Sequence, residues 1–517
     1  HYLDTGKSQQ QAEQFASEQD EYDKTFFVPE IARWKNLKDL KHDVGSELNK
    51  ATEAIEEQNP TLEGVLVSID FNIKDKLNDG KLRDLLSHYS KYRLRTSDFE
   101  RPDLLGAAYE YLIKMFADSA GKKGGEFYTP NEVVKLLIEL IKPEGGMKVY
   151  DPTCGSGGML IQTRNFLESN GENPSNLMLY GQERNLSTWA ICKLNMFLHG
   201  VRGADIKKGD TLGDPKHLEN GEIMRFDRVI ANPPFSLKNW GQDIANKDEF
   251  GRYKFGIPPK DAGDLAFVQH MIASLNNEGV MGVVVPHGVL FRGGTEKTIR
   301  TGIIENDLLE AVIGLPPSLF YGTSIPAALL IINKKKDKSK IKKILFINSE
   351  NNYSEEKNQN ILREEDIEKI KTCFHSNAVI KRFSRIANLE EIRNNDYNLI
   401  IKKYADTSPP KEKFDVIGIL KGGIPLEEIE DEYTKEILNG FNLNSILVKK
   451  DSDYMKFNEN IKDKSQIRDV LGNVPKELLL IFESWWDKYS ISISKIDSEI
   501  MESESLMKNF LKELGYE

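Results

Sequence analysis

The chain has 517 residues, of which 39% are hydrophobic and 29% charged, and its formal net charge is −11. At roughly 100–200 residues per domain, this length predicts about two to four domains. The acidic balance argues against a protein that coats nucleic acid through bulk positive charge. Apolar runs such as 280–286 are far shorter than the ~20 residues of a membrane helix, so we expect no membrane partner.

Cysteine and histidine usage narrows the class further. Three scattered cysteines form no disulfide framework or zinc-ligand spacing, and the eight histidines include no HxxxH or HxH pair. We therefore expect no metal site and a reducing cytosol. The chain opens with no signal peptide and with His1 rather than Met, so we expect its start to be cut or processed.

The first 120 residues are expected to form a helical domain. Apolar residues recur at helical spacing over 37–55 and 82–92 among many charges. In the first stretch, Leu37, Leu40, Val44 and Leu48 fall on one face.

From about residue 121 short strand-like runs alternate with helix-length segments. The expected strands are 147–151, 178–182, 206–209, 227–231, 280–286, 309–315 and 327–333, and the expected helices are 157–168, 186–199, 264–275 and 295–306. This alternation is typical of a parallel, doubly wound sheet with right-handed crossovers. We predict a catalytic domain over 121–350.

The remaining chain is less regular. A charged run at 334–340, KKKDKSK, is interpreted as an exposed turn, and another strand is expected over 343–348. We expect a mixed extension over 351–473 and C-terminal helices over 474–517. These amphipathic helices either pack on their own domain or dock a partner helix.

The first chemical signal is the loop DPTCGSGG at 151–158, which follows a strand and opens a helix. Ligands of open α/β sheets bind at the carboxyl ends of strands. Glycines let the backbone approach a ligand, and a helix N-terminus favours a negative group such as a carboxylate. Asp151 at the strand end can hold a positive amino group.

Acidic residues also end the next two expected strands. Glu183 lies where a ribose would be held through its hydroxyls, and Asp210 follows the third strand at the same edge. Together the three carboxylates suit a nucleoside with a cationic tail better than a pyrophosphate.

The second signal is Asn232-Pro233-Pro234-Phe235 at the end of the fourth expected strand. Proline fixes φ and removes a backbone donor, so the neighbouring carbonyl has one direction and no competing N–H. The Asn232 side-chain oxygen and that carbonyl form two neutral acceptors for an –NH₂ group. Phe235 can stack on a flat ring.

With these motifs the sequence resembles the amino-group DNA methyltransferases that use S-adenosylmethionine, in the class that methylates adenine N6. GEFYTPN at 125–131 matches the segment that closes over the cofactor. The segments KFGIPP at 254–259, DLAF at 264–267, VPHGVLFRGG at 285–294 and IGLP at 313–316, together with the ending at 511–517, resemble the modification subunit of type I restriction–modification systems. The resemblance covers about residues 97–335 well and the ends loosely.

The resemblance implies a fold and a set of site residues. The fold is a Rossmann-like methyltransferase sheet with a helical N-terminal domain, here expected to be truncated at its start, and a helical C-terminal extension. The implied catalytic residues are Asn232, Pro233, Pro234 and Phe235. The implied cofactor-binding residues are Glu126, Phe127, Tyr128, Thr129, Pro130, Asn131, Asp151, Thr153, Gly155, Ser156, Gly157, Gly158, Glu183 and Asp210.

The resemblance also implies partners and a setting. S-adenosylmethionine is the expected cofactor and S-adenosylhomocysteine the product, with no metal. The expected partners are double-stranded DNA, a separate specificity subunit, a second copy of this chain and a restriction (nuclease/translocase) subunit. We expect a prokaryotic cytoplasmic protein that is nucleoid-associated when on DNA.

Two other functions fit parts of the sequence. Asn-Pro-Pro-aromatic motifs also occur in methyltransferases of protein glutamine or of guanine in RNA, because these substrates present an –NH₂ group too. A non-catalytic assembly subunit could keep the same fold, although the intact motif at 232–235 and the three carboxylates argue against a dead site.

Overall fold

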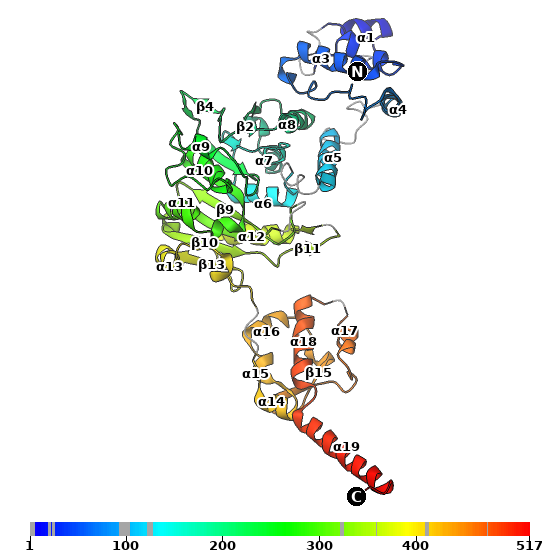
Figure 1. The fold of residues 1–517 in the computed structure, drawn as a ribbon, viewed down its shortest axis with the longest axis vertical. Coiled ribbons are helices and arrows are strands. Elements are labelled where there is room, and N and C mark those ends of the chain that lie inside the picture. The colour runs from blue at the N-terminus through cyan, green and yellow to red at the C-terminus, as the bar shows by residue number, and fades with distance from the viewer. Residues whose placement is uncertain are drawn as a thin grey trace. The chain divides into compact units, whose positions relative to one another are not determined.

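The computed structural model describes residues 6–18, 22, 26–92, 104–120, 128–320, 325–357, 359–408, 413–472 and 474–516. Contacts divide the chain into two compact units, His1–Thr407 and Ser408–Glu517, which are described separately (Figure 1). No helix among the described residues is long and apolar enough to cross a membrane.

The N-terminal part of the larger unit is helical. Its helices are α1 (Gln9–Phe15), α2 (Trp34–Leu37), α3 (Val44–Gln58), α4 (Asp79–Tyr89) and α5 (Leu104–Ala120). The single helix predicted over 37–55 is wrong at its start, because Asp43 has a left-handed φ of 51° and begins a new helix there. Val44 of α3 packs with Leu82 and Leu86 of α4 in a small core.

The described residues form one nine-stranded sheet in the order β13-β10-β8-β9-β7-β6-β1-β2-β3. The strands are β1 (Lys148–Asp151), β2 (Met178–Glu183), β3 (Asp205–Lys208), β6 (Phe226–Ala231), β7 (Leu275–Pro286), β8 (Leu309–Gly314), β9 (Ala327–Asn333), β10 (Lys343–Asn348) and β13 (Ser384–Asn388). Every expected strand is present, which confirms the α/β class.

The sheet is mixed rather than wholly parallel. Strands β3, β2, β1, β6 and β7 run parallel, whereas β9 is antiparallel to both β7 and β8, and β13 is antiparallel to β10. A parallel return needs a crossover, usually a helix. The described residues between Gly314 and Ala327 contain no helix, so the chain re-enters the sheet from the edge at which β8 ends.

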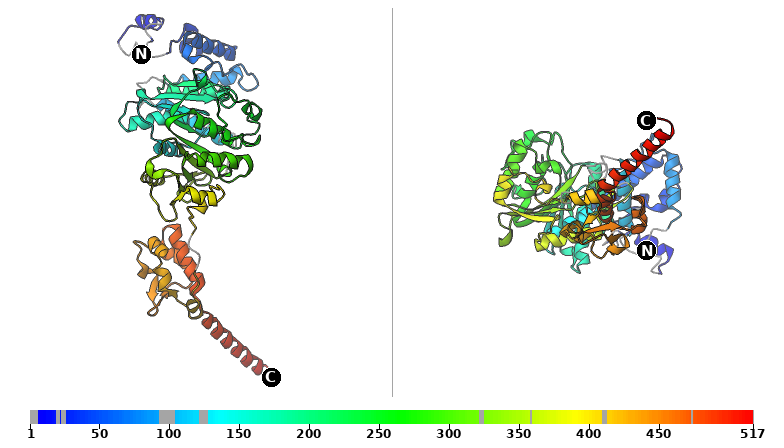
Figure 2. Two further views of the ribbon diagram at one scale, coloured as in Figure 1. Left: turned by 90° about the vertical axis from the view of Figure 1, so that its left-hand side faces the viewer. Right: turned by 90° about the horizontal axis from the view of Figure 1, so that it is seen from below.

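Helices cover both faces of the sheet (Figures 1 and 2). One face packs against α6 (Asn131–Ile141), α7 (Gly158–Ser169), α8 (Leu186–Leu198) and α12 (Glu364–Ser376), and the other against α10 (Asp264–Ser274), α11 (Gly294–Glu305) and α13 (Leu389–Asn394). Alternate strand residues face opposite cores, as Val149 and Tyr150 do in β1. Shorter elements are β4 (Leu218–Glu219), β5 (Glu222–Ile223), α9 (Gln242–Ala245), β11 (Ser354–Glu355) and β12 (Asn360–Ile361).

Residues 351–407 belong to the larger unit, where β13 extends the sheet and α12 packs on α6. This differs from the boundary expected after residue 350. The smaller unit contains α14 (Val416–Lys421), β14 (Ile424–Pro425), α15 (Leu426–Ile429), α16 (Glu432–Ile437), β15 (Leu447–Lys449), β16 (Tyr454–Phe457), α17 (Ser465–Leu471), α18 (Lys476–Tyr489) and α19 (Ile493–Glu513).

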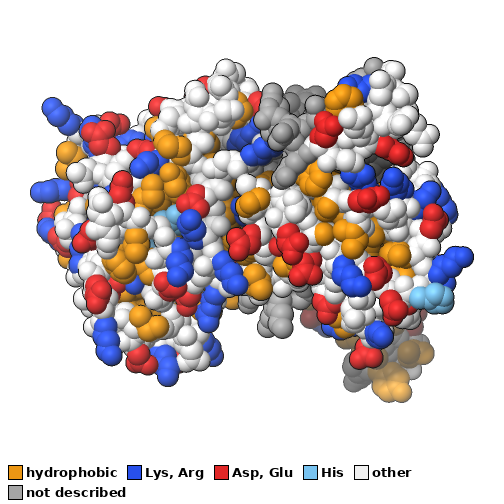
Figure 3. Space-filling model, turned by 90° about the horizontal axis from the view of Figure 1, so that it is seen from above, with side chains coloured by type: hydrophobic (Ala, Val, Ile, Leu, Met, Phe, Trp, Pro, Cys, Tyr) orange, Lys and Arg blue, Asp and Glu red, His pale blue; other side chains and the backbone are white. Residues whose placement is uncertain are grey.

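The two C-terminal helices differ in their packing. The helix α18 buries Leu478, Phe482 and Trp485 in the core of the smaller unit, so it packs on its own domain. The helix α19 has no buried residue and exposes Ile496, Ile500 and Phe510. On the face of the molecule drawn in Figure 3, positive and negative side chains are intermixed.

Candidate active site

The candidate site lies at the carboxyl ends of the neighbouring parallel strands β1 and β6. The chain leaves β1 toward β2 on one side and reaches β6 on the other, so the strand order reverses at this point. Such a switch point is where open α/β sheets bind ligands. A narrow pocket opens there, with about 520 Å³ of empty space when its mouth is included.

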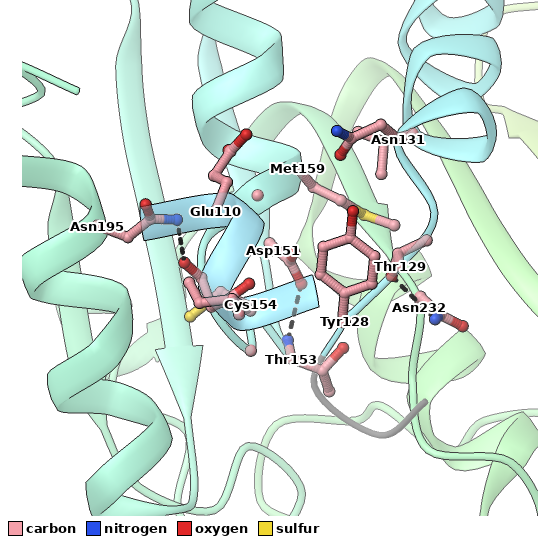
Figure 4. A pocket seen from close by; sticks show the side chains of 15 residues that line it. Glu110, Tyr128, Thr129, Asn131, Asp151, Thr153, Cys154, Met159, Asn195 and Asn232 are labelled. Atoms are coloured by element: carbon pink, nitrogen blue, oxygen red, sulfur yellow. Dashed lines mark hydrogen bonds between the residues drawn. The ribbon is translucent and has the colours of Figure 1, made fainter. Parts of the chain in front are cut away.

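The pocket brings together residues from the three sequence signals (Figure 4). The segment before α6, the loop after β1 and the residue after β6 all contribute to its wall. The predicted site residues that line it are Tyr128, Thr129, Asn131, Asp151, Thr153, Gly155, Ser156, Gly158 and Asn232.

The loop after β1 is shaped by its glycines. Gly155 and Gly157 have φ values of 51° and 83°, a left-handed conformation that other residues rarely adopt. A Cβ atom on Gly157 would lie 2.8 Å from Cys192 Sγ and 2.9 Å from Met196 Cε, both in α8. Glycine is therefore required at 157 by both backbone angle and packing, and α7 begins directly after it.

Asp151 is a buried carboxyl group at the end of β1. It is 2% exposed, and its Oδ1 accepts a hydrogen bond from the Thr153 amide at 2.9 Å. Burial raises the pKa of Asp151 to about 8, because desolvation disfavours the charged carboxylate. A cation beside this group would favour its ionised form, so Asp151 suits a positively charged ligand.

Glu183 at the end of β2 lies next to the glycine loop. Its two oxygens accept hydrogen bonds from the amides of Gly155, at 3.1 Å, and Asn185, at 2.7 Å. Burial raises the pKa of Glu183. The carboxylate thus positions the loop.

Asn232 directly follows β6. Its Nδ2 donates a hydrogen bond to Thr129 Oγ1 at 3.0 Å, which joins two segments about a hundred positions apart in the chain. Its Oδ1 is buried and has no hydrogen-bond partner in the described part of the chain. A buried acceptor without a donor is costly unless a ligand supplies one.

Other predicted residues lie away from the pocket lining. Asp210 follows β3 with its side chain 35% exposed and 3.7 Å from Arg184. Phe235 packs edge-on against Phe320, with ring centroids 5.9 Å apart. Pro130, Gly157, Glu183, Pro233 and Pro234 are also outside the lining set. Glu126 and Phe127 lie outside the described residues.

The pocket also contains residues that sequence reasoning missed. Glu110 and Ile113 come from α5, and Asn195 comes from α8. Burial raises the pKa of Glu110, whose Oε1 lies 3.6 Å from His199 Nε2. Asn195 donates to the Ser156 carbonyl at 3.0 Å and keeps a buried Oδ1 without a partner among described residues. Helical spacing gives no signal for such contacts.

A second feature that the sequence did not predict is a set of contacts to the turn directly after the Asn-Pro-Pro-Phe segment. Ser236 has a left-handed φ of 50°, and its amide donates to Asp264 Oδ1 at 2.8 Å. Arg292 NH1 lies 3.6 Å from each of the buried carboxylates of Asp264 and Glu296. The DLAF and VPHGVLFRGG segments therefore meet at this turn, which explains their presence near the site.

With this geometry in hand, comparison with known proteins defines the class. A family model described as "N-6 DNA Methylase" matches residues 100–413, and one described as "HsdM N-terminal domain" matches residues 2–88. The chain belongs to the N-6 DNA methylase family, and the relatives below are type I restriction enzyme methylase subunits.

Three relatives illustrate the match. The MjaVII and MjaVIII methylase subunits of Methanocaldococcus jannaschii are 38% and 36% identical over 69% and 79% of this chain. The chain spans 62% and 71% of their respective lengths. A type I restriction–modification methyltransferase subunit from Streptococcus thermophilus superimposes with a TM-score of 0.68 at 30% identity, covering 76% of this chain and 86% of that chain.

Proposed function

We propose that this chain is a site-specific DNA adenine-N6 methyltransferase that uses S-adenosylmethionine. It would act on a flipped-out adenine as the modification subunit of a type I restriction–modification complex. The observation that carries the proposal is Asn232 Oδ1, a buried acceptor at a switch point, beside the pocket that contains Asp151. The family membership given above supports the same chemistry.

The pocket residues fit S-adenosylmethionine by their donor set. Asp151 offers a buried carboxyl group to the cationic amine of the cofactor's methionine part. The left-handed glycine loop leaves space for the carboxylate of the same methionine part near the start of α7. Thr153 Oγ1 and Asn195 Oδ1 are further buried polar atoms without a hydrogen-bond partner in the described ranges. When bound, the cofactor supplies a methyl group activated by a positively charged sulfur.

Asn232 and the Pro233 carbonyl would accept hydrogen bonds from the adenine amino group. The lone pair of adenine N6 is delocalised into the ring. Two acceptors that bind the hydrogens of N6 draw this nitrogen toward a tetrahedral shape, which frees the lone pair for reaction. Pro233 and Pro234 have no N–H, so this stretch of backbone presents no donor beside the Pro233 carbonyl. Positioning of this kind can supply up to roughly 7–11 kcal/mol of the barrier reduction.

The target base must leave the duplex to reach this edge of the sheet. Flipping costs a few kcal/mol, and stacking on an aromatic ring returns about 1–3 kcal/mol. Phe235 is the ring we propose for this contact. It is partly buried and forms an edge-to-face pair with Phe320.

Sequence recognition would come from a separate specificity subunit. The relatives' names identify them as subunits of restriction enzymes, and the mixed charge and acidic total of this chain fit delegated DNA reading. We propose α19 as a docking helix, because its apolar residues Ile496, Ile500 and Phe510 are exposed. A second copy of the chain and a restriction subunit complete the proposed complex.

Methylation mapping tests this function. Genomes of cells with and without the chain, each expressing the specificity subunit, are sequenced for N6-methyladenine. We expect one DNA motif to lose its methyl groups when the chain is absent. Unchanged DNA methylation, with methyl groups lost instead from protein glutamine or RNA guanine, would contradict the proposal.

A further inference from the structure

A second pocket lies at the amino end of the central strands, the edge opposite to Asp151 and Asn232. It sits where β6 and β7 begin and the antiparallel β9 ends. Its empty space is about 840 Å³ with the mouth included. Its lining includes two aromatic residues, Phe250 and Phe255, and four cationic residues, Arg225, Arg252, Lys254 and Lys334.

Lys334 differs from Lys335, Lys336 and Lys340 in the run 334–340. Lys335 pairs with Glu278, Lys336 with Asp307 at 2.6 Å, and Lys340 with Glu310 at 2.6 Å. Lys334 instead turns into the pocket, where its Nζ donates to the Leu275 carbonyl at 2.6 Å. The run was expected to be an exposed turn, yet its first lysine is only partly exposed.

The electrostatic surroundings of Lys334 are positive. Burial, together with the positive charges of Arg225 and Lys254, lowers the pKa of Lys334 to about 8. No carboxylate among the described residues forms an ion pair with any of these three cations. Arg252 also lines the pocket, but it is paired with Asp248 at 2.7 Å. Three like charges therefore converge on one hollow without a counter-ion from the described chain.

We propose that this pocket binds a phosphate group. A phosphate monoester carries about −1.5 to −2 charges at pH 7 and three acceptor oxygens. The charge of a phosphate matches three cations better than the single charge of a carboxylate ligand would. The Arg225 guanidinium is also suited to two-point contact with phosphate. Phe250 and Phe255, whose rings lie near Arg252 and Lys254, add apolar surface for an organic group attached to it.

The phosphate has two possible sources, a small phosphorylated molecule or the backbone of nucleic acid. Calorimetry with the full chain distinguishes them at constant ionic strength in chloride buffer, with three probes: inorganic phosphate, adenosine monophosphate and a random-sequence DNA duplex. We expect saturable phosphate binding with a Kd at or below about 1 mM. Tighter binding of the nucleotide indicates a small molecule, and displacement of phosphate by the duplex indicates backbone.

Variants assign the binding to this pocket. Lys334→Gln and Arg225→Gln should each weaken phosphate binding at least about tenfold, which is a loss of about 1.4 kcal/mol. Lys335→Gln, the adjacent lysine with its own carboxylate partner, is the matched control and should bind like the parent. If Lys334→Gln does not fold, Lys254→Gln tests the exposed side of the same pocket.

Three results would overturn the proposal, and none depends on methyl transfer. The first is an absence of saturable phosphate binding by the parent chain. The second is parental affinity in both Lys334→Gln and Lys254→Gln. The third is binding of an aspartate-rich peptide at Lys334 without binding of phosphate, which would make the pocket a contact for an acidic protein segment.

Discussion

Asn232 Nδ2 donates to Thr129 Oγ1 at 3.0 Å, while Asn232 Oδ1 is buried without a partner among described residues. This contact holds the amide in the orientation that leaves its oxygen available as an acceptor. Because the oxygen and nitrogen ends of an amide are similar in shape, loss of this hydrogen bond would allow the Asn232 side-chain amide to flip by about 180°.

Replacing Thr129 with valine removes the hydroxyl at nearly constant volume. We expect methyl transfer to fall about tenfold, the size of one lost hydrogen bond. Single-turnover rates measure this effect. Thr163→Val is the control, because Thr163 is a buried threonine whose hydroxyl donates to a carbonyl within α7. Equal rates for Thr129→Val and Thr163→Val would remove Thr129 from the mechanism.

Glu183 accepts hydrogen bonds from the Gly155 amide of the glycine loop and from the Asn185 amide that follows β2. Glu183→Ala leaves these donors unpaired, so we expect cofactor affinity to fall at least about tenfold. Calorimetry with S-adenosylhomocysteine measures it. Glu172→Ala is the matched control, since Glu172 accepts from the Gly145 amide at 2.9 Å away from the pocket. Unchanged affinity in Glu183→Ala would take Glu183 out of the cofactor site.

Phe235 is proposed to stack on the extruded base. Phe235→Ala should lower turnover on a fully paired duplex by about 1–3 kcal/mol of lost stacking. A mismatch at the target adenine makes flipping cheaper, so the loss should be smaller on that substrate. Parallel rate measurements on the two duplexes give the comparison. The same loss on both would contradict the stacking role.

Asp151 makes the stability of the ligand-free chain depend on pH. The pKa of Asp151 is about 8 in the folded chain, which is above its value in the unfolded chain. The protonated carboxyl group therefore contributes to folding stability at low pH, and this contribution is lost as pH rises from about 4 through 8. Asp151→Asn keeps an oxygen for the Thr153 amide and removes the charge. We expect the variant to gain stability over the parent as pH rises, by up to several kcal/mol, on the order of 1.4 per pKa unit. Urea unfolding at pH 5 and pH 8 measures the difference, and a constant difference would contradict the raised pKa.

The same group should couple cofactor binding to pH. A cationic ligand needs the ionised carboxylate, so affinity should rise about tenfold between pH 6 and pH 7, where the ligand's amine stays charged. Calorimetry at the two values measures this, and Asp151→Asn should remove the dependence. A parent whose affinity is flat over this interval would show that no proton leaves Asp151 on binding.

The sequence predicted the strands, and with them the edge at which Asp151 and Asn232 meet. Apolar runs and strand-ending motifs depend only on neighbouring residues, so they can be recognised in the sequence. It did not predict the antiparallel direction of β9, which depends on a return without a helix, or the contributions of Glu110 and Asn195, which depend on how α5 and α8 pack. The position of Lys334 was not predicted for a similar reason. In the sequence the lysines of this run are alike, whereas in the structure Lys336 and Lys340 pair with carboxylates distant in the chain and Lys334 lines a pocket.

The most direct test of the central claim is Asn232→Ala, assayed for methyl transfer to adenine in duplex DNA with the specificity subunit present, alongside calorimetry of S-adenosylhomocysteine. Loss of an oriented hydrogen-bonding group at a reacting centre typically lowers turnover about 10²–10³-fold. We expect at least that loss with cofactor affinity unchanged. Methyl transfer at the parental rate, or cofactor affinity lost together with activity, would contradict the assigned role of Asn232.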